Sequence, residues 1–102
     1  MTLQAAQQQV DDLLSQPGRG YWPPFVQLAH LIEEVGELAR LQNHLYGQKP
    51  KKASEAEQDM VGELGDILFA LICIANQEKV DLEAALSATI HKSATRDKDR
   101  FK

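Results

Sequence analysis

Apolar residues recur along most of the chain at the three- and four-residue spacing of amphipathic helices, and the alternation typical of strands is nearly absent. Between residues 61 and 75 the sequence is apolar on almost every side of a helix, which is typical of a helix at the centre of a domain or an oligomer. The pattern predicts four helices, at about residues 2–15, 23–46 and 54–77, and from residue 82 into a charged tail.

Start and stop signals separate these segments, because proline fits the first turn of a helix and glycine commonly follows the last. The third helix is expected to begin at a capping box formed by Ser54 and Glu57, and the fourth to be capped by Asp81. The other signals are Pro17-Gly18 after the first segment, Pro23-Pro24 before the second and Gly47 after it.

Four helices joined by short links favour a helical bundle, and the length favours one domain spanning residues 1–102. Three small neighbours can hardly cover a third helix that is apolar all round. We therefore expect an all-α bundle that is completed by homo-oligomerisation, as a dimer or a tetramer.

Composition and charge narrow the range of functions. The formal net charge of −4 argues against a general nucleic-acid binder, which would show a basic face, although a bound divalent cation would still allow a nucleotide substrate. The single cysteine, Cys73, lies in an apolar run and is expected to be a buried hydrophobe in a reducing compartment. The polar N-terminus is unlike a secretory signal, and the longest apolar run is shorter than the ~20 residues of a membrane span, so we expect a cytoplasmic protein without membrane contact.

Two pairs of carboxylates lie at the edges of apolar helix faces: Glu34 with Glu37, and Glu63 with Asp66. The spacing of three residues places each pair on one face of its helix. An ordinary solvated surface is the alternative interpretation, but local salt-bridge partners are scarce. If the pairs face each other, two charges about 5 Å apart repel by roughly 3 kcal/mol at an effective dielectric constant near 20. A cation is therefore expected between them.

Oxygen-only ligation favours magnesium, manganese or calcium over zinc. None of the three histidines, His30, His44 and His91, pairs with another at a metal-ligand spacing. His30 lies one turn before Glu34, where it could support that carboxylate or simply line the edge of the core.

Three glycines, Gly36, Gly62 and Gly65, lie inside the same helical segments, although each costs about 1 kcal/mol relative to alanine in a helix. Close approach of the helices around the carboxylates would explain them. Tolerated helix glycines are the alternative.

Lys92 and Arg96 are four residues apart and project from one face of the fourth helix. They could bind a phosphate chain that bridges them to a metal ion on the carboxylates. They could equally complement the dipole near the C-terminus of that helix.

At these residues the chain resembles the MazG-like family of all-α nucleoside triphosphate pyrophosphohydrolases. The family signature is Glu-x-x-Glu, a spacer and Glu-x-x-Asp, which Glu34, Glu37, Glu63 and Asp66 match with 25 residues in the spacer. The resemblance covers about residues 21–101 and ends in the basic pair of the fourth helix, although Ser93 stands where an aromatic residue is common.

The resemblance implies hydrolysis between the α- and β-phosphates of a nucleoside triphosphate, giving a nucleoside monophosphate and pyrophosphate. It also implies a role in clearing damaged or surplus nucleotides, with Mg²⁺, or Mn²⁺ in its place, on the four carboxylates. Among these, Glu37 is the candidate to orient or deprotonate water. Asn76 could contact base or sugar or cap a helix, and Trp22 could stack on a base or anchor the start of its helix. Lys51 and Lys52 could contact phosphate or form a solvated loop.

Two rival interpretations stay open to test. One is a non-catalytic helical interaction module whose carboxylates hold a structural ion. The other is a di-iron bundle, which normally uses Glu-x-x-His pairs, and the sequence contains none.

Overall fold

The structure, a computed structural model, describes residues 1–47 and 53–100, and their side chains except those of residues 53–58 and 97–100. This part of the chain contains helices and no strand, which confirms the all-α prediction. The four helices are α1 (Leu3–Leu14), α2 (Pro24–Tyr46), α3 (Ala53–Glu78) and α4 (Leu82–Arg100).

Side-chain caps explain where α1 and α4 begin. Thr2 Oγ1 accepts a hydrogen bond from the Ala5 N–H at 3.0 Å at the start of α1. Asp81 Oδ1 accepts from the N–H groups of Glu83 and Ala84 at 3.0 and 3.2 Å, which confirms the predicted cap of α4. These backbone bonds, above all the one from Ala84, lower the pKa of Asp81 below its ordinary value.

The third helix begins at Ala53, one residue before the predicted cap. The side chains of the predicted capping box, Ser54 and Glu57, lie outside the described residues. The same holds for Lys51 and Lys52.

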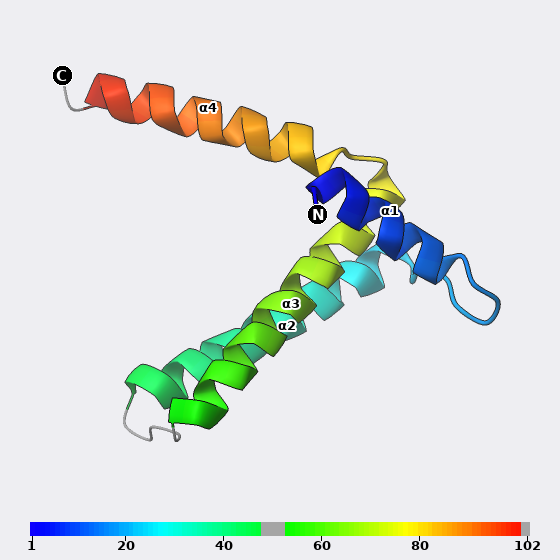
Figure 1. The fold of residues 1–102 in the computed structure, drawn as a ribbon, viewed down its shortest axis with the longest axis horizontal. Coiled ribbons are helices and arrows are strands. Elements are labelled where there is room, and N and C mark those ends of the chain that lie inside the picture. The colour runs from blue at the N-terminus through cyan, green and yellow to red at the C-terminus, as the bar shows by residue number, and fades with distance from the viewer. Residues whose placement is uncertain (48–52, 101–102) are drawn as a thin grey trace.

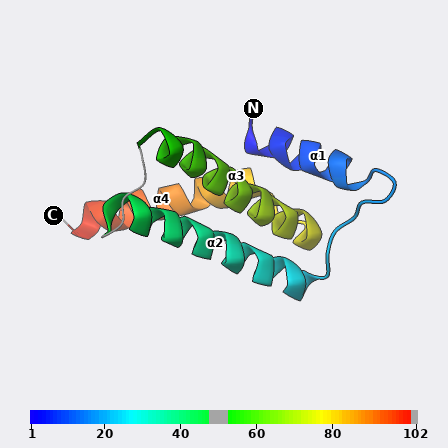
Figure 2. The same cartoon turned by 90° about the horizontal axis from the view of Figure 1, so that it is seen from below.

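α2 and α3 run antiparallel along each other, and α1 lies across the C-terminal end of α3 (Figures 1 and 2). Hydrogen bonds fix that crossing: Gln7 Nε2 donates to Asn76 Oδ1 and to the Val80 carbonyl, both at 2.9 Å. The small buried apolar core lies along these contacts and consists of Val10, Leu41, Ala70, Ile72 and Ala75.

α4 projects away from the α2–α3 pair as a separate arm (Figure 1). The radius of gyration is 16.9 Å, whereas a compact domain of this length has about 13 Å. The accessible surface is 7835 Å², against about 5,800 Å² for a compact monomer of this mass. One chain alone therefore leaves its bundle open. None of the described helices is long and apolar enough to cross a membrane.

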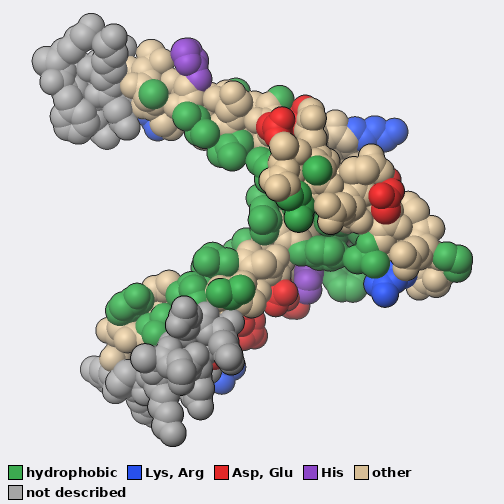
Figure 3. All heavy atoms as spheres, viewed as in Figure 1, with side chains coloured by type: hydrophobic (Ala, Val, Ile, Leu, Met, Phe, Trp, Pro, Cys, Tyr) green, Lys and Arg blue, Asp and Glu red, His purple; other side chains and the backbone are tan. Residues whose placement is uncertain are grey.

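The α2–α3 pair and α4 form two arms, and large apolar side chains lie exposed along both of them. Figure 3 shows apolar side chains on the sides of these arms that border the gap between them. On α3, Val61 is 71% exposed, although the sequence predicts a helix buried on all sides. The exposed large apolar side chains include Val61, Leu64 and Leu68 on α3 and Leu86 and Ile90 on α4.

The prediction that the helix glycines mark a close approach of two helices is wrong within the chain. A Cβ atom added at Gly36, Gly62 or Gly65 would meet no atom of the described residues within 4 Å. All three lie on exposed sides of their helices, because the α2–α3 contact runs along other residues.

Candidate metal and nucleotide site

The antiparallel pairing of α2 and α3 brings together carboxylates that are distant in sequence. One carboxylate oxygen from each of Glu34, Glu63 and Asp66 lies within 4.8 Å of the other two. Glu34 and Glu63 are half-buried and Asp66 is exposed. The three side chains therefore surround one point at the edge of the helix pair.

Glu63 is the member of this cluster whose carboxylate is least stabilised by its surroundings in the charged form. Its Oε2 is covered from solvent and accepts no hydrogen bond from the described residues. Desolvation raises the pKa of Glu63 above its ordinary value, and the charges of Glu37, Glu34, Asp66 and Asp59 raise it further. A cation would relieve both the repulsion and the missing contact.

Glu37 lies beside the three-oxygen cluster and is not part of it. It lines a neighbouring groove of about 170 Å³ together with Glu63, and its charge is the largest single charge acting on the Glu63 pKa. The other residues of this groove are Arg40, Leu41, His44 and Asp59.

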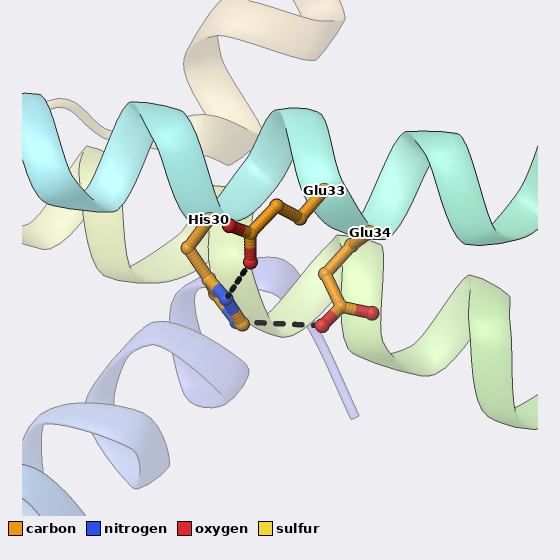
Figure 4. A network of polar contacts seen from close by, with 3 residues as sticks. All are labelled: His30, Glu33 and Glu34. Carbon is orange, nitrogen blue, oxygen red and sulfur yellow. Dashed lines mark ion pairs between the residues drawn. The ribbon is translucent and has the colours of Figure 1, made fainter.

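His30 supports Glu34 from the preceding turn of α2, as its spacing allowed. Its Nε2 lies 3.5 Å from Glu34 Oε1 and its Nδ1 lies 4.0 Å from Glu33 Oε2 (Figure 4). The indole ring of Trp22 meets the imidazole edge to face, with ring centroids 5.1 Å apart and an interplanar angle of 85°. Trp22 thus contacts His30, and His30 contacts Glu34 of the carboxylate cluster.

The donor set fits a hard divalent cation. Every candidate ligand is a carboxylate oxygen, which magnesium, manganese and calcium prefer, and the covered oxygen of Glu63 is an acceptor that a cation would satisfy. Glu34, Glu63 and Asp66 would hold the ion, and Glu37 lies next to them.

Asn76 lies further along α3 and its amide is engaged in a network within the chain. Its Nδ2 donates to the Gln7 carbonyl and to the Tyr21 hydroxyl, both at 3.0 Å. The Tyr21 hydroxyl in turn donates to Asp11 Oδ1 at 2.7 Å. Burial, followed by the bond to Asp11, raises the pKa of Tyr21 to about 12. Asn76 thus joins α1 and the connector to α3.

Lys92 and Arg96 lie exposed on one face of α4, where they line a shallow groove with His91 and Thr95. α4 points away from α2 and α3, so one chain does not bring this basic pair to the carboxylates (Figure 1).

Gln27 is a candidate site residue that was not predicted from the sequence; it is 4% exposed and lies on the buried side of α2. The sequence feature that could have indicated it is a polar glutamine on the apolar face of the second helix, two turns before Glu34. Its side chain lines a cavity of about 240 Å³ that also touches His30. The other lining residues are Leu14, Arg19, Gly20, Tyr21, Trp22, Phe69, Ala70 and Cys73.

Comparison with known proteins decides the family. Residues 26–101, which include most of α2 and all of α3 and α4, match the MazG nucleotide pyrophosphohydrolase domain. The chain belongs to the MazG nucleotide pyrophosphohydrolase family. Members of the MazG family are hydrolases that act on nucleotides, which agrees with the resemblance seen in the sequence.

Other MazG-like proteins are similar over nearly the whole length. The uncharacterized protein YpjD of Bacillus subtilis (strain 168) is 48% identical over 98% of this chain and 90% of its own length. The crystal structure of a Bacillus-conserved MazG protein, a nucleotide pyrophosphohydrolase, superposes with a TM-score of 0.80 at 42% identity, covering 97% of this chain and 96% of that one. The crystal structure of YpjD from Bacillus subtilis superposes with a TM-score of 0.81 at 46% identity, covering 90% and 94%.

Proposed function

We propose that this MazG-family chain is a magnesium-dependent pyrophosphohydrolase that converts nucleoside triphosphates, deoxy or ribo, into nucleoside monophosphates and pyrophosphate. The observation that carries the proposal is the meeting of three carboxylate oxygens from two helices within 4.8 Å, together with a covered oxygen of Glu63 that has no hydrogen-bond partner among the described residues. Clearance of unwanted nucleotides in the cytoplasm is the role that we propose for this activity.

We assign separate roles in the reaction to the residues in and around the carboxylate cluster. Glu34, Glu63 and Asp66 would hold the cation, and His30, whose Nε2 lies 3.5 Å from Glu34 Oε1, would hold Glu34 in place. Bound magnesium, or manganese in its place, would neutralise charge that develops on the phosphate oxygens and lower the pKa of water. Glu37, which lines a groove together with Glu63, would accept a proton from an attacking water.

The basic pair of α4 requires a second copy of the chain in this proposal. At 100° per residue, Lys92 and Arg96 lie together on one side of the apolar stripe that contains Leu86 and Ile90, roughly 80° to 120° around the helix from Leu86. A second copy of the chain that packs on this stripe would bring the second copy's carboxylate cluster close to Lys92 and Arg96. The two basic side chains would then bind the phosphates of a nucleotide held at that cluster. The open surface described above supports such a homo-oligomer, a dimer or a tetramer.

Two further side chains have proposed substrate contacts. Trp22 would stack on the base, since its ring borders the cavity next to His30. Asn76 would contact base or sugar only by giving up bonds that it makes to Gln7 and Tyr21.

The proposal is tested by incubating the protein with magnesium and a panel of canonical and modified nucleoside triphosphates and measuring pyrophosphate. Turnover should stop when a chelator removes the metal and return with magnesium or manganese. Glu63→Gln should reduce turnover by at least about 100-fold while helicity is retained. Glu78→Gln, the same change at an exposed residue of the same helix, should have no effect. Absence of turnover with every nucleotide would instead indicate a binding module with a structural ion.

A further inference from the structure

The cavity beside Gln27 continues the carboxylate site along the groove between α2 and α3. His30 lines the cavity and contacts Glu34, and Ala70 lines it one turn after Asp66. Seven residues separate Gln27 from Glu34, which corresponds to about 10 Å along a helix. A ligand with its phosphates at the carboxylates therefore reaches the cavity with its other end.

The size and lining of the cavity suit a flat heterocycle. Its volume is about 240 Å³. Pockets for whole drug-sized ligands span about 300–1,000 Å³, while an apolar cavity of roughly 150 Å³ already accepts benzene. Trp22 and Phe69 contribute aromatic surface, and Ala70 and Cys73 contribute apolar surface.

The Gln27 amide presents one unused hydrogen-bonding group at this place. Its Nε2 donates to the Trp22 carbonyl at 2.9 Å and lies 3.4 Å from Gln77 Oε1. Because a carbonyl can only accept, this contact fixes which end of the amide is the NH₂ group. The Oε1 is covered from bulk solvent and accepts no hydrogen bond from the residues that the structure describes. An unpartnered buried acceptor is costly, and a ligand N–H would satisfy it.

We propose that the cavity holds the base of the nucleotide and that Gln27 Oε1 accepts a hydrogen bond from a base N–H. This inference rests on the proposed nucleotide substrate and adds a rule of selection to it. A base whose edge offers an N–H is accepted, and a base whose N–H groups are replaced by N-methyl groups is rejected, because it leaves the Gln27 oxygen unpaired.

Trp22 supplies a local probe, since it is the only tryptophan of the chain and borders the cavity. We would titrate the unmodified protein, without divalent cation, with three nucleosides and follow tryptophan fluorescence. Thymidine, cytidine and adenosine would each be compared with the partner that lacks the edge N–H groups: N3-methylthymidine, N4,N4-dimethylcytidine and N6,N6-dimethyladenosine. At least one parent nucleoside should change the fluorescence saturably, and its methylated partner should bind roughly 5- to 100-fold more weakly.

Two variants separate this inference from the proposed reaction. Gln27→Met keeps the length of the side chain and removes the acceptor, so it should bind the parent and its methylated partner with similar affinity. Glu63→Gln should lose turnover but keep nucleoside binding with the same preference.

Equal binding of parent and methylated nucleosides by the unmodified protein would overturn the inference, as would the absence of any saturable signal, even if triphosphates are hydrolysed. A preference for the parent nucleosides in a protein without turnover would support the base site and contradict only the proposed reaction. Because the ligand comparison uses the unmodified protein, the result does not depend on whether Gln27→Met folds.

Discussion

Two side-chain amides, Asn76 on α3 and Gln27 on α2, show how the same functional group serves different purposes in this chain. The Asn76 amide uses both its oxygen and its nitrogen in bonds to Gln7 and Tyr21, and so it joins α1 to α3. The Gln27 amide uses only its nitrogen and keeps a covered oxygen without a partner among the described residues. A filled hydrogen-bonding capacity stabilises the fold, whereas an unfilled one at a cavity is available to a ligand.

The Tyr21 hydroxyl gives the α1–α3 network a pH dependence. Its pKa is raised from 10.0 to about 12, so the folded protein holds the proton more tightly than the unfolded chain does. The resulting stabilisation is complete below pH 10 and is lost as the pH rises through 12. Tyr21→Phe should lower the free energy of unfolding by about 1 kcal/mol at neutral pH and remove this alkaline loss.

Urea unfolding at a series of pH values measures both effects of Tyr21→Phe. Tyr46→Phe, at a residue that is 80% exposed, is the matched control and should change neither quantity. Identical alkaline profiles for the two variants would contradict the assignment of the raised pKa to the network.

At the scale of the helices, the features that the sequence predicts correctly are those set by interactions between neighbouring residues. Caps such as Thr2 and Asp81 act within one turn, so the starts of α1 and α4 follow from neighbouring residues. The meeting of Glu34 with Glu63 also follows, because helices joined by a short link pack side by side and their edge carboxylates then approach. The place of Glu37, beside the cluster, depends on side-chain reach between helices and has no local signal.

Gly36 shows why the glycine prediction failed: helical spacing tells which face a residue occupies, but not whether another helix lies opposite. Because a Cβ at Gly36 would meet no atom of the described residues within 4 Å, Gly36→Ala should raise the free energy of unfolding by about 1 kcal/mol. Gly18→Ala is the opposite control, since Gly18 has φ +80° and a side chain there is strained. Denaturant unfolding followed by circular dichroism measures both. Destabilisation by Gly36→Ala would show that another surface packs against this side of α2.

At the scale of the whole molecule, the direction of α4 is the feature that the sequence does not reveal. The residue that follows α3, Lys79, is left-handed with φ 59°, at a place where glycine is the usual choice. The Val80 N–H bonds back to the Ala75 carbonyl at 2.8 Å and closes this turn. The sequence predicts a break between residues 77 and 82, but with no glycine there it does not indicate the direction of the turn, which sends α4 away from the carboxylates of its own chain. The sequence does show that the third helix is apolar on nearly every side. In one chain, part of that apolar surface therefore stays exposed to solvent.

The proposed oligomer uses this open surface, and Ile90→Lys should break it. A charge in the middle of the α4 apolar stripe, at a side chain that is 59% exposed in one chain, opposes burial against a second copy. Sedimentation and light scattering should show a dimer or tetramer for the unmodified protein and a monomer for the variant, with turnover reduced at least about 10-fold. Ala88→Lys adds the same charge at an exposed position about 160° around α4 from both Leu86 and Ile90 and should leave the assembly intact.

Mixing two inactive variants then tests whether the basic pair acts across the interface. Arg96→Ala lacks a phosphate contact and Glu63→Gln lacks a metal ligand, so neither homo-oligomer should turn over substrate. In a mixed oligomer, the carboxylates of the first variant face the intact basic pair of the second, and one complete site is rebuilt. Activity should therefore return on mixing if α4 serves its partner. If α4 instead folded back onto its own chain, every site would lack one group and the mixture would stay inactive, so restored turnover distinguishes the two arrangements.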